Sequence, residues 1–166
     1  MTKETIRPKE YRVYKPYGES KGAASAFQVK ITLDSEESPG KKRIVELFWV
    51  CTNQTGQNSS TGNASFGWSD PKQSITMKMG LPDIGEILSL LEGDKEEISL
   101  FHQNRSGNTV AKMKQAQTKS GPAFGFQMSS KKGDNLTKVR HNFSMSDSKI
   151  LKRLLQDYIS LYHDWL

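Results

Sequence analysis

Two segments in the first third of the chain have the hydrophobic patterns of β-strands. Apolar residues recur at every second position from Phe27 to Leu33, which predicts a strand with one buried face. Arg43–Cys51 is apolar on both faces apart from Glu46 and predicts a second, more buried strand. The charged segment Asp34–Lys42 between them contains a Pro-Gly pair and predicts a turn.

The rest of the first half predicts two short strands followed by a helix. Apolar residues at helical spacing run from Ile84 to Leu91, with Pro82 suited to the first turn and Gly93 suited to the end. The strands are predicted at 64–68 and 73–79, after a loop rich in Asn, Gly, Ser and Thr at 53–63.

The second half repeats this order of elements. Lys132–Asn135 predicts a hairpin turn, and Ser146 is the expected N-cap of a long C-terminal helix. The strands of this half are predicted at 97–103, 109–117, 123–131 and 138–145.

The predicted fold is therefore α+β, with two antiparallel four-stranded β-sheets packed with two helices in the order ββββα repeated. Residues 1–10 are polar and are expected to be flexible. Residues 11–166 are expected to form a single domain, with the first ββββα unit at about 11–93 and the second at about 94–166.

The C-terminal helix is apolar over a wide arc. This arc predicts either a helix buried within its own subunit or a contact between the subunits of a homo-oligomer. The residues assigned to the subunit contact are Leu151, Leu155, Tyr158, Tyr162 and Trp165.

The distribution of charge favours a polyanionic partner. The formal net charge is +6, and strand alternation places a set of basic residues opposite the apolar faces of their strands, where they can neutralise phosphates. Acidic residues gather instead in and after the first helix. This segregation favours nucleic acid over the alternative of a protein that is merely soluble and basic. The basic residues are Lys30, Lys78, Lys112, Lys114, Lys131, Lys138 and Arg140.

Preference for single strands requires flat side chains on which unpaired bases stack, each worth about 1–3 kcal/mol. Phe48 lies on the outward side of its strand, and Trp68 lies beside a turn that also contains Lys72. Each of these aromatic residues can equally be a core or interface residue. Lys15, among the tyrosines near the N-terminus, adds a further cation.

No catalytic constellation stands out. Cys51 lies in the middle of a predicted strand, and the three histidines share no metal-ligand spacing, so we expect no enzyme activity, no cofactor and no metal site. The single cysteine fits a reducing compartment. No apolar run is long enough to span a membrane, and the N-terminus lacks a secretory signal. We therefore expect a cytoplasmic protein without membrane contact, or an organelle protein that has lost a transit peptide.

Several short motifs follow one another along the chain. They are Tyr11-Arg12-Val13-Tyr14-Lys15, Lys21-Gly22-Ala23-Ala24-Ser25, Phe66-Gly67-Trp68-Ser69 with Lys72-Gln73, Leu81–Leu90, Phe101-His102 and Phe124–Met128. In this order and spacing they resemble the Whirly family of single-stranded DNA-binding proteins, known mainly from plant organelles. The resemblance runs from about Tyr11 to Trp165, and no single motif is specific by itself.

The resemblance implies a fold, an assembly and a ligand. These are two four-stranded antiparallel sheets with two helices, a homotetramer assembled through the helices, and binding of single-stranded DNA with little sequence preference. The resemblance carries binding roles over to Lys21 and Trp68. The second lysine of the family's Lys-Gly-Lys motif, which is tied to higher assembly, is Ala23 here, and an insertion at 16–20 precedes it. The resemblance therefore gives no basis for assemblies beyond a tetramer.

Three functions stay open at this point. The first is binding of single-stranded DNA in DNA maintenance or transcription. The second is binding of RNA, because related folds include mitochondrial guide-RNA-binding proteins. The third is an oligomeric partner-binding protein whose lysines only make it soluble. A nuclease would need acidic metal ligands on the basic face, and alternation places none there.

Overall fold

The computed structural model describes residues 4–18, 21–33 and 43–163, with the side chains of 10–18, 21–32 and 44–163. The predicted turn at 34–42 and the predicted interface residue Trp165 lie outside the described residues. In chain order the elements are β1 (Glu4–Lys15), β2 (Ala23–Leu33), β3 (Arg43–Gln57), β4 (Ala64–Phe66), β5 (Ser74–Met79), α1 (Leu81–Leu91), β6 (Glu97–Asn104), β7 (Gly107–Thr118), β8 (Gly121–Lys132), β9 (Asn135–Ser144) and α2 (Met145–Tyr162).

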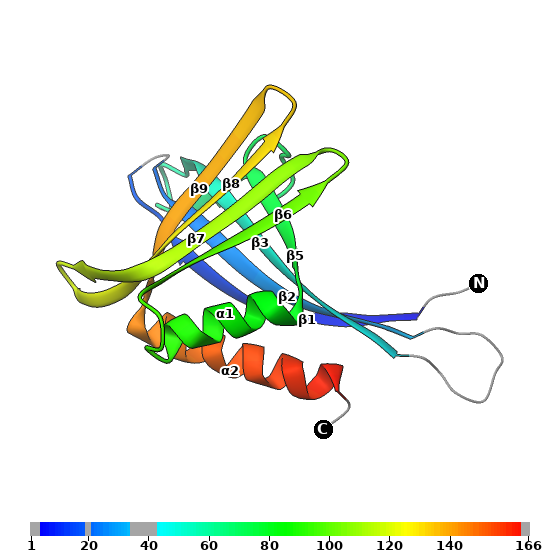
Figure 1. The fold of residues 1–166 in the computed structure, drawn as a ribbon. Coiled ribbons are helices and arrows are strands. Elements are labelled where there is room, and N and C mark those ends of the chain that lie inside the picture. The colour runs from blue at the N-terminus through cyan, green and yellow to red at the C-terminus, as the bar shows by residue number, and fades with distance from the viewer. Residues whose placement is uncertain (1–3, 19–20, 34–42, 164–166) are drawn as a thin grey trace.

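Two antiparallel sheets pack face to face, and the strands of one cross those of the other (Figure 1). The second sheet has the order β6-β7-β8-β9. The first has the order β1-β2-β3-β5, and the short strand β4 pairs with the far end of β3 as a fifth member. The predicted α+β class with two antiparallel sheets and two helices is confirmed. The predicted count of four strands in the first sheet differs from the five described.

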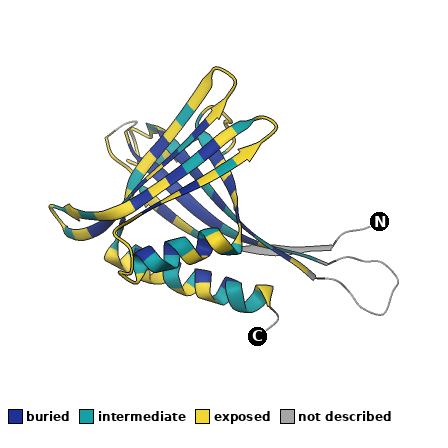
Figure 2. Cartoon of the chain, viewed as in Figure 1, coloured by how far each residue is buried: buried dark blue, intermediate teal, exposed yellow. Residues whose placement is uncertain are grey.

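The core lies between the inward faces of the two sheets. Alternate residues of β3, such as Leu47, Trp49 and Cys51, are buried. The same alternation is visible as alternating colours along the strands of the second sheet (Figure 2). The Trp49 indole stacks on the Phe126 ring of β8, with centroids 4.4 Å apart. Phe143 of β9 packs against the same indole at 6.1 Å. Residues from both halves of the chain therefore share one core.

Two segments that were predicted to be irregular are paired strands. β1 begins at Glu4 rather than after residue 10, and its main chain pairs with β2 as far as Leu33. β3 continues to Gln57, inside the segment predicted as a loop, and carries β4. Both extensions depend on main-chain hydrogen bonds to a neighbouring strand, which form whatever the side-chain pattern.

The N-terminus of α2 is capped by Ser144 and not by Ser146 as predicted. The Ser144 hydroxyl accepts a hydrogen bond from the Asp147 main-chain nitrogen at 3.0 Å. The Asp147 carboxylate in turn accepts one from the Ser144 main-chain nitrogen at 2.8 Å, which completes a capping box. The Asp147 charge also suits the positive end of the helix dipole.

Three of the residues predicted to contact another subunit are buried within this chain, which corrects that assignment. Leu151 and Leu155 of α2 are fully buried in the common core. Tyr158 is also buried, and its hydroxyl donates a hydrogen bond to the Val45 carbonyl oxygen at 3.2 Å. The inward-facing apolar residues of α2 pack against the sheets and α1. Tyr162, at the end of the helix, remains exposed.

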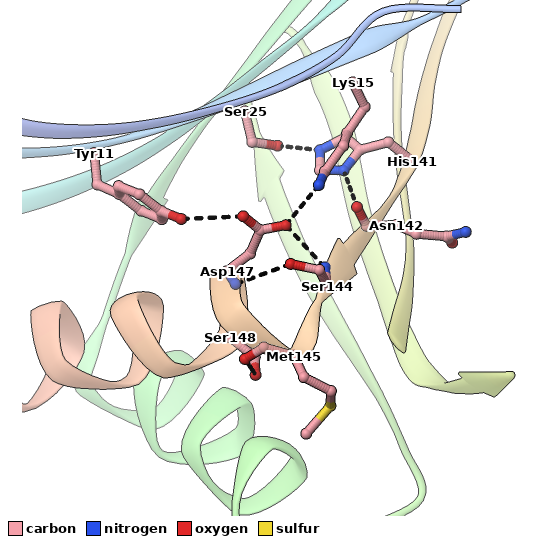
Figure 3. A network of polar contacts seen from close by, with 9 residues as sticks. All are labelled: Tyr11, Lys15, Ser25, His141, Asn142, Ser144, Met145, Asp147 and Ser148. Carbon is pink, nitrogen blue, oxygen red and sulfur yellow. Dashed lines mark hydrogen bonds and ion pairs between the residues drawn. The ribbon is translucent and has the colours of Figure 1, made fainter. Parts of the chain in front are cut away.

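A polar network joins the start of α2 to both sheets (Figure 3). Asp147 forms an ion pair with Lys15 of β1 at 2.7 Å and accepts a hydrogen bond from the Tyr11 hydroxyl at 3.3 Å. Burial opposes the charge of Asp147, but its hydrogen bonds with Lys15 and Ser144 prevail and lower its pKa. Burial, and next the Asp147 charge, raise the pKa of Tyr11 to about 12, so this hydroxyl stays a donor.

His141 of β9 lies beside this network and also links the sheets. Its Nε2 atom is 2.6 Å from the Ser25 hydroxyl of β2, and that hydroxyl accepts a hydrogen bond from the Trp49 indole at 3.1 Å. Burial lowers the pKa of His141 to about 4, and the neighbouring Lys15 charge acts in the same direction. His141 is therefore neutral near pH 7, with Nε2 accepting from Ser25.

Acid should destabilise the fold through His141. Its folded-state pKa of about 4 lies below the ordinary value of 6.5, so the unfolded chain binds the proton more tightly. The stabilisation is complete above pH 6.5 and declines as the pH falls toward 4, by about 3 kcal/mol at most. Urea unfolding at a series of pH values measures this free energy. His141→Gln should flatten the profile, whereas His102→Gln should retain it; a retained slope in His141→Gln contradicts the assignment.

Candidate nucleic-acid interface

The outer face of the second sheet is basic, with one carboxylate on it: Glu97 lies opposite Lys114 in the strand register. Antiparallel register places Lys112 opposite Gln127, and Gln127 opposite Arg140. Among the described residues, no carboxylate forms an ion pair with any of its basic side chains. We call this surface the basic face; its cations are the exposed Lys112, Lys114, Lys131, Lys138 and Arg140.

A groove of about 900 Å³ crosses the middle of the basic face. Gly125 of β8 lies at its floor opposite Lys114 and Asn142, and the missing side chain leaves room above the strand. Glu97 is the acidic residue in its wall. The polar side chains that line it are Ser99, Lys112, Lys114, Gln127, Arg140 and Asn142. The groove thus offers positive charge and amide groups. The Phe101 side chain, which is 60% exposed, lies on the same face of the sheet outside the groove.

The outer face of the first sheet differs because one of the two lysines described on it forms an ion pair with a carboxylate on the same face. The Lys78 ammonium is 2.7 Å from the Glu46 carboxylate. Lys30 pairs with Glu46 in the strand register, which places it beside the same carboxylate. The alternation correctly placed these lysines outward. Their capacity to bind phosphates is reduced because the Glu46 charge offsets theirs.

Phe48, the predicted stacking residue of this face, is half-buried. It lies between Gln28 of β2 and Lys78 of β5 in the strand register. Its outward side is confirmed, since its neighbours Leu47 and Trp49 are fully buried inward. Flanking side chains cover part of its ring, so Phe48 offers less surface for stacking than an exposed aromatic residue.

An aromatic cluster lies at the end of the first sheet where β1 and β4 approach each other. The Tyr14 ring is 5.3 Å from Phe66 and 6.3 Å from Trp68, measured between centroids, and it meets the indole edge-on. The Arg12 guanidinium lies over the indole, 5.0 Å from its centroid. Tyr14 is 47% exposed, and Trp68 is half-buried. These four side chains, Arg12, Tyr14, Phe66 and Trp68, form the aromatic cluster.

Gln54 binds the described residues at both ends of the connection between β1 and β2. Its side-chain oxygen accepts hydrogen bonds from the main-chain nitrogens of Tyr17 at 2.9 Å and Gly22 at 3.1 Å. Its amide nitrogen donates to the Gly18 carbonyl at 2.9 Å. Lys21, the position carried over from the family resemblance, is exposed in this connection.

The loop that contains Lys72 is attached to the edge of the second sheet. The Thr137 hydroxyl of β9 donates to the Lys72 carbonyl at 3.3 Å. The Asn53 side chain donates to the Lys138 carbonyl at 3.0 Å. These contacts bring Trp68 and Lys72, which lie in the same β4–β5 connection, to the side of the basic face where Lys138 lies.

Lys15 is the predicted binding residue that the structure places elsewhere. It lies on the inward face of β1, since it alternates with the exposed Tyr14 and pairs with the buried Ala23. Its ammonium is engaged by Asp147. The alternating sequence from Tyr11 to Lys15 was compatible with either orientation, and only the position of α2 shows which face is buried. We do not include Lys15 in the proposed binding surface.

Sequence reasoning missed several polar and aromatic side chains of these surfaces. Phe66 was not singled out because a three-residue strand shows no periodicity. Gln127 and Asn142 carry no charge and so gave no signal of their own. The signal that could have found them is register, since residues paired with an outward lysine must themselves face outward.

The order of strands and helices defines the class of protein, and the chain has a Whirly-like fold. The Whirly protein WHY1 from Arabidopsis thaliana superposes with a TM-score of 0.71 at 15% identity, covering 96% of this chain and 88% of that chain. The plant transcriptional regulator PBF-2 superposes with a TM-score of 0.67 at 17% identity, covering 96% and 85%. A guide-RNA-binding protein complex bound to a gRNA superposes with a TM-score of 0.56 at 15% identity, covering 95% and 92%.

These likenesses establish the fold. No family model matches the sequence, and no curated protein matches it. Within the described residues, no helix is long and apolar enough to cross a membrane. The same residues contain no group of three or more His, Cys, Asp or Glu that could hold a metal ion.

Gly22→Ala should destabilise the protein and displace the β1–β2 turn. A Cβ atom at Gly22 would lie 2.4 Å from the Lys15 carbonyl oxygen and 2.6 Å from the Pro16 Cα, so main-chain atoms must move. We expect a loss of about 1–3 kcal/mol in the free energy of unfolding, measured with urea. Gly85→Ala is the matched control, because its Cβ meets open space within α1 and should add up to about 1 kcal/mol. A loss in both variants would contradict this explanation.

Proposed function

We propose that this protein binds single-stranded nucleic acid without catalysing a reaction on it, with single-stranded DNA as the main ligand. The observation that carries the proposal is the basic face, whose five cations form no ion pair among the described residues and outnumber its one carboxylate, Glu97. Lysine and arginine that are not engaged within the protein are available to phosphates, and binding to phosphates releases counterions.

The aromatic cluster supports the single-strand part of the proposal. Tyr14 and Trp68 present ring surfaces on which an unpaired base can stack, while the Arg12 guanidinium beside them is engaged by Glu10. A duplex keeps its bases stacked inside and cannot use these rings. Charge on one sheet and aromatic surface on the other together favour an unpaired strand.

The solved structures of similar fold are consistent with nucleic-acid binding. PBF-2 is a transcriptional regulator, and the guide-RNA-binding complex is bound to a gRNA. We infer a role in DNA maintenance or transcription for this chain. RNA is the second candidate ligand, and the RNA-bound structure of similar fold is the observation that favours it. Titrating DNA and RNA of one sequence separates the two candidates.

We also propose that the protein forms a homo-oligomer, with a tetramer as the expected form. The exposed apolar side chains of α2 that are available to a second copy are Met145, Ile150 and Tyr162, in place of the buried Leu151 and Leu155. Light scattering on the intact protein gives the mass, and a monomer would overturn this proposal.

Affinity for oligo-dT should fall steeply with salt, and the basic face should set the slope. Lys112→Gln should lower the slope of log affinity against log salt by about 0.7, because the variant can no longer neutralise one phosphate. Lys78→Gln is the matched control, because Glu46 already engages that ammonium and its removal should change the slope less. Fluorescence anisotropy at several salt concentrations measures both. Absence of binding at low salt would overturn the proposed function, and equal slopes in the two variants would overturn the assignment to the basic face.

Trp68→Ala should weaken binding of oligo-dT by about 1–3 kcal/mol while leaving the salt slope nearly unchanged. The reason is that the indole offers stacking surface and no charge. Affinity for a duplex of the same length should change little. Tyr162→Ala, which removes an exposed aromatic residue of α2, is the control and should leave oligo-dT affinity unaltered at protein concentrations that keep the assembly intact. Equal losses for duplex and single strand would contradict a stacking role.

A further inference from the structure

A second hollow, which we call the seam pocket, lies where the two sheets meet at β9. Its volume is about 430 Å³. Three parts of the chain line it: the β1–β2 turn with Tyr17 and Lys21, the β7–β8 turn with Ser120, and β9 with Arg140 and Asn142. The part of Figure 3 around Lys15 and His141 shows one wall of this region.

The charges of the seam pocket suit an anion. Lys15 reaches it but is offset by Asp147 at 2.7 Å. Lys21 and Arg140 also line it, and neither forms an ion pair with any described residue. The pocket therefore has two positive charges that no described carboxylate offsets, in a concave site where phosphate oxygens can approach both.

The size and the uncharged walls of the pocket suit a nucleoside. A volume of about 430 Å³ lies within the range of small-molecule sites. Pro16 and Pro122 supply apolar wall, and Tyr17, which is 71% exposed, supplies an aromatic ring at the rim. The Asn142 side chain makes no hydrogen bond to a described residue, so its amide is available to a base edge.

The seam pocket is continuous with the groove of the basic face. Arg140, His141 and Asn142 line both hollows, so β9 is their common wall. A strand whose phosphates follow Lys112 and Arg140 along the groove reaches the pocket where it crosses β9. The geometry points to one nucleotide of the bound strand occupying the seam pocket, its phosphate between Lys21 and Arg140 and its base against Tyr17. This inference rests on the proposed function.

Occupancy of the pocket requires an unpaired nucleotide, because a base held between the two turns cannot pair with a complementary strand. The pocket therefore gives a second source of single-strand preference, separate from the aromatic cluster. A Trp68→Ala variant should retain part of its discrimination against duplex for this reason.

Nuclear magnetic resonance of the histidine rings can detect binding along β9. The chain has three histidines. His141 lines both the seam pocket and the groove, so a shift that is lost in Ser120→Glu is the one assigned to the pocket, whereas His102 is bonded to Asp83 at the start of α1, at 2.9 Å. Adding thymidine monophosphate, and separately oligo-dT, should move the His141 ring signals and leave those of His102 in place. Inorganic phosphate as a third probe shows whether the phosphate alone accounts for the shift.

Variants at Ser120 and Lys21 test the pocket without altering the groove. Ser120→Glu places a negative charge at the rim and should weaken thymidine monophosphate binding about tenfold, whereas the uncharged Ser120→Gln should change it less than about twofold. Lys21→Gln should weaken it roughly three- to fivefold. Lys119→Gln is the charge control, because Lys119 adjoins Ser120 in the same turn but does not line the pocket.

The outcomes separate this inference from the proposed function on which it rests. If His141 moves no more than His102 with either nucleotide probe, while oligo-dT still binds in a salt-dependent way, the seam pocket is not a nucleotide site and the basic face stands. Equal binding by Ser120→Glu and Ser120→Gln likewise excludes a nucleotide from the pocket. If oligo-dT does not bind at low salt, the proposed function itself fails.

Discussion

The packing of the two sheets on each other is the contact on which the rest of the structure depends. Trp49 of the first sheet stacks on Phe126 of the second, and alternate residues on either side close around this pair. Because side chains alternate along a strand, burial of one face of each sheet leaves the other face outward. The same packing that builds the core therefore creates two large outer surfaces, available for binding wherever the helices do not cover them.

The two outer surfaces differ in the way that their charges are matched. Glu46 and Glu10 form ion pairs with basic side chains on the first sheet, whereas the cations of the basic face form none among the described residues. Positive charge that is already paired contributes little to phosphate binding. The first sheet instead carries the aromatic cluster around Tyr14 and Trp68. The unpaired charge thus lies on the second sheet and the aromatic cluster on the first, and β9 with the Lys72 loop lies between them.

The start of α2 connects the helices to both sheets. Asp147 caps the helix, pairs with Lys15 and accepts from Tyr11, so a single carboxylate satisfies groups from β1 and from its own helix. His141 lies beside this arrangement in its neutral form, bonded to Ser25. These contacts hold β9 against the β1–β2 region and form one wall of the seam pocket.

The sequence by itself determined the class of fold, the positions of most strands and the outward side of the lysines on β2, β5, β7, β8 and β9, because hydrophobic periodicity reflects burial directly. It left the strand pairing of residues 4–10 and 53–57 undetermined, since main-chain hydrogen bonds carry no side-chain pattern. Only the tertiary structure decided which charges are paired, that Lys15 faces Asp147, and that Leu151 and Leu155 lie in the core. The physical reason is that pairing and burial depend on which segments meet in space, and that is decided between elements distant in the chain.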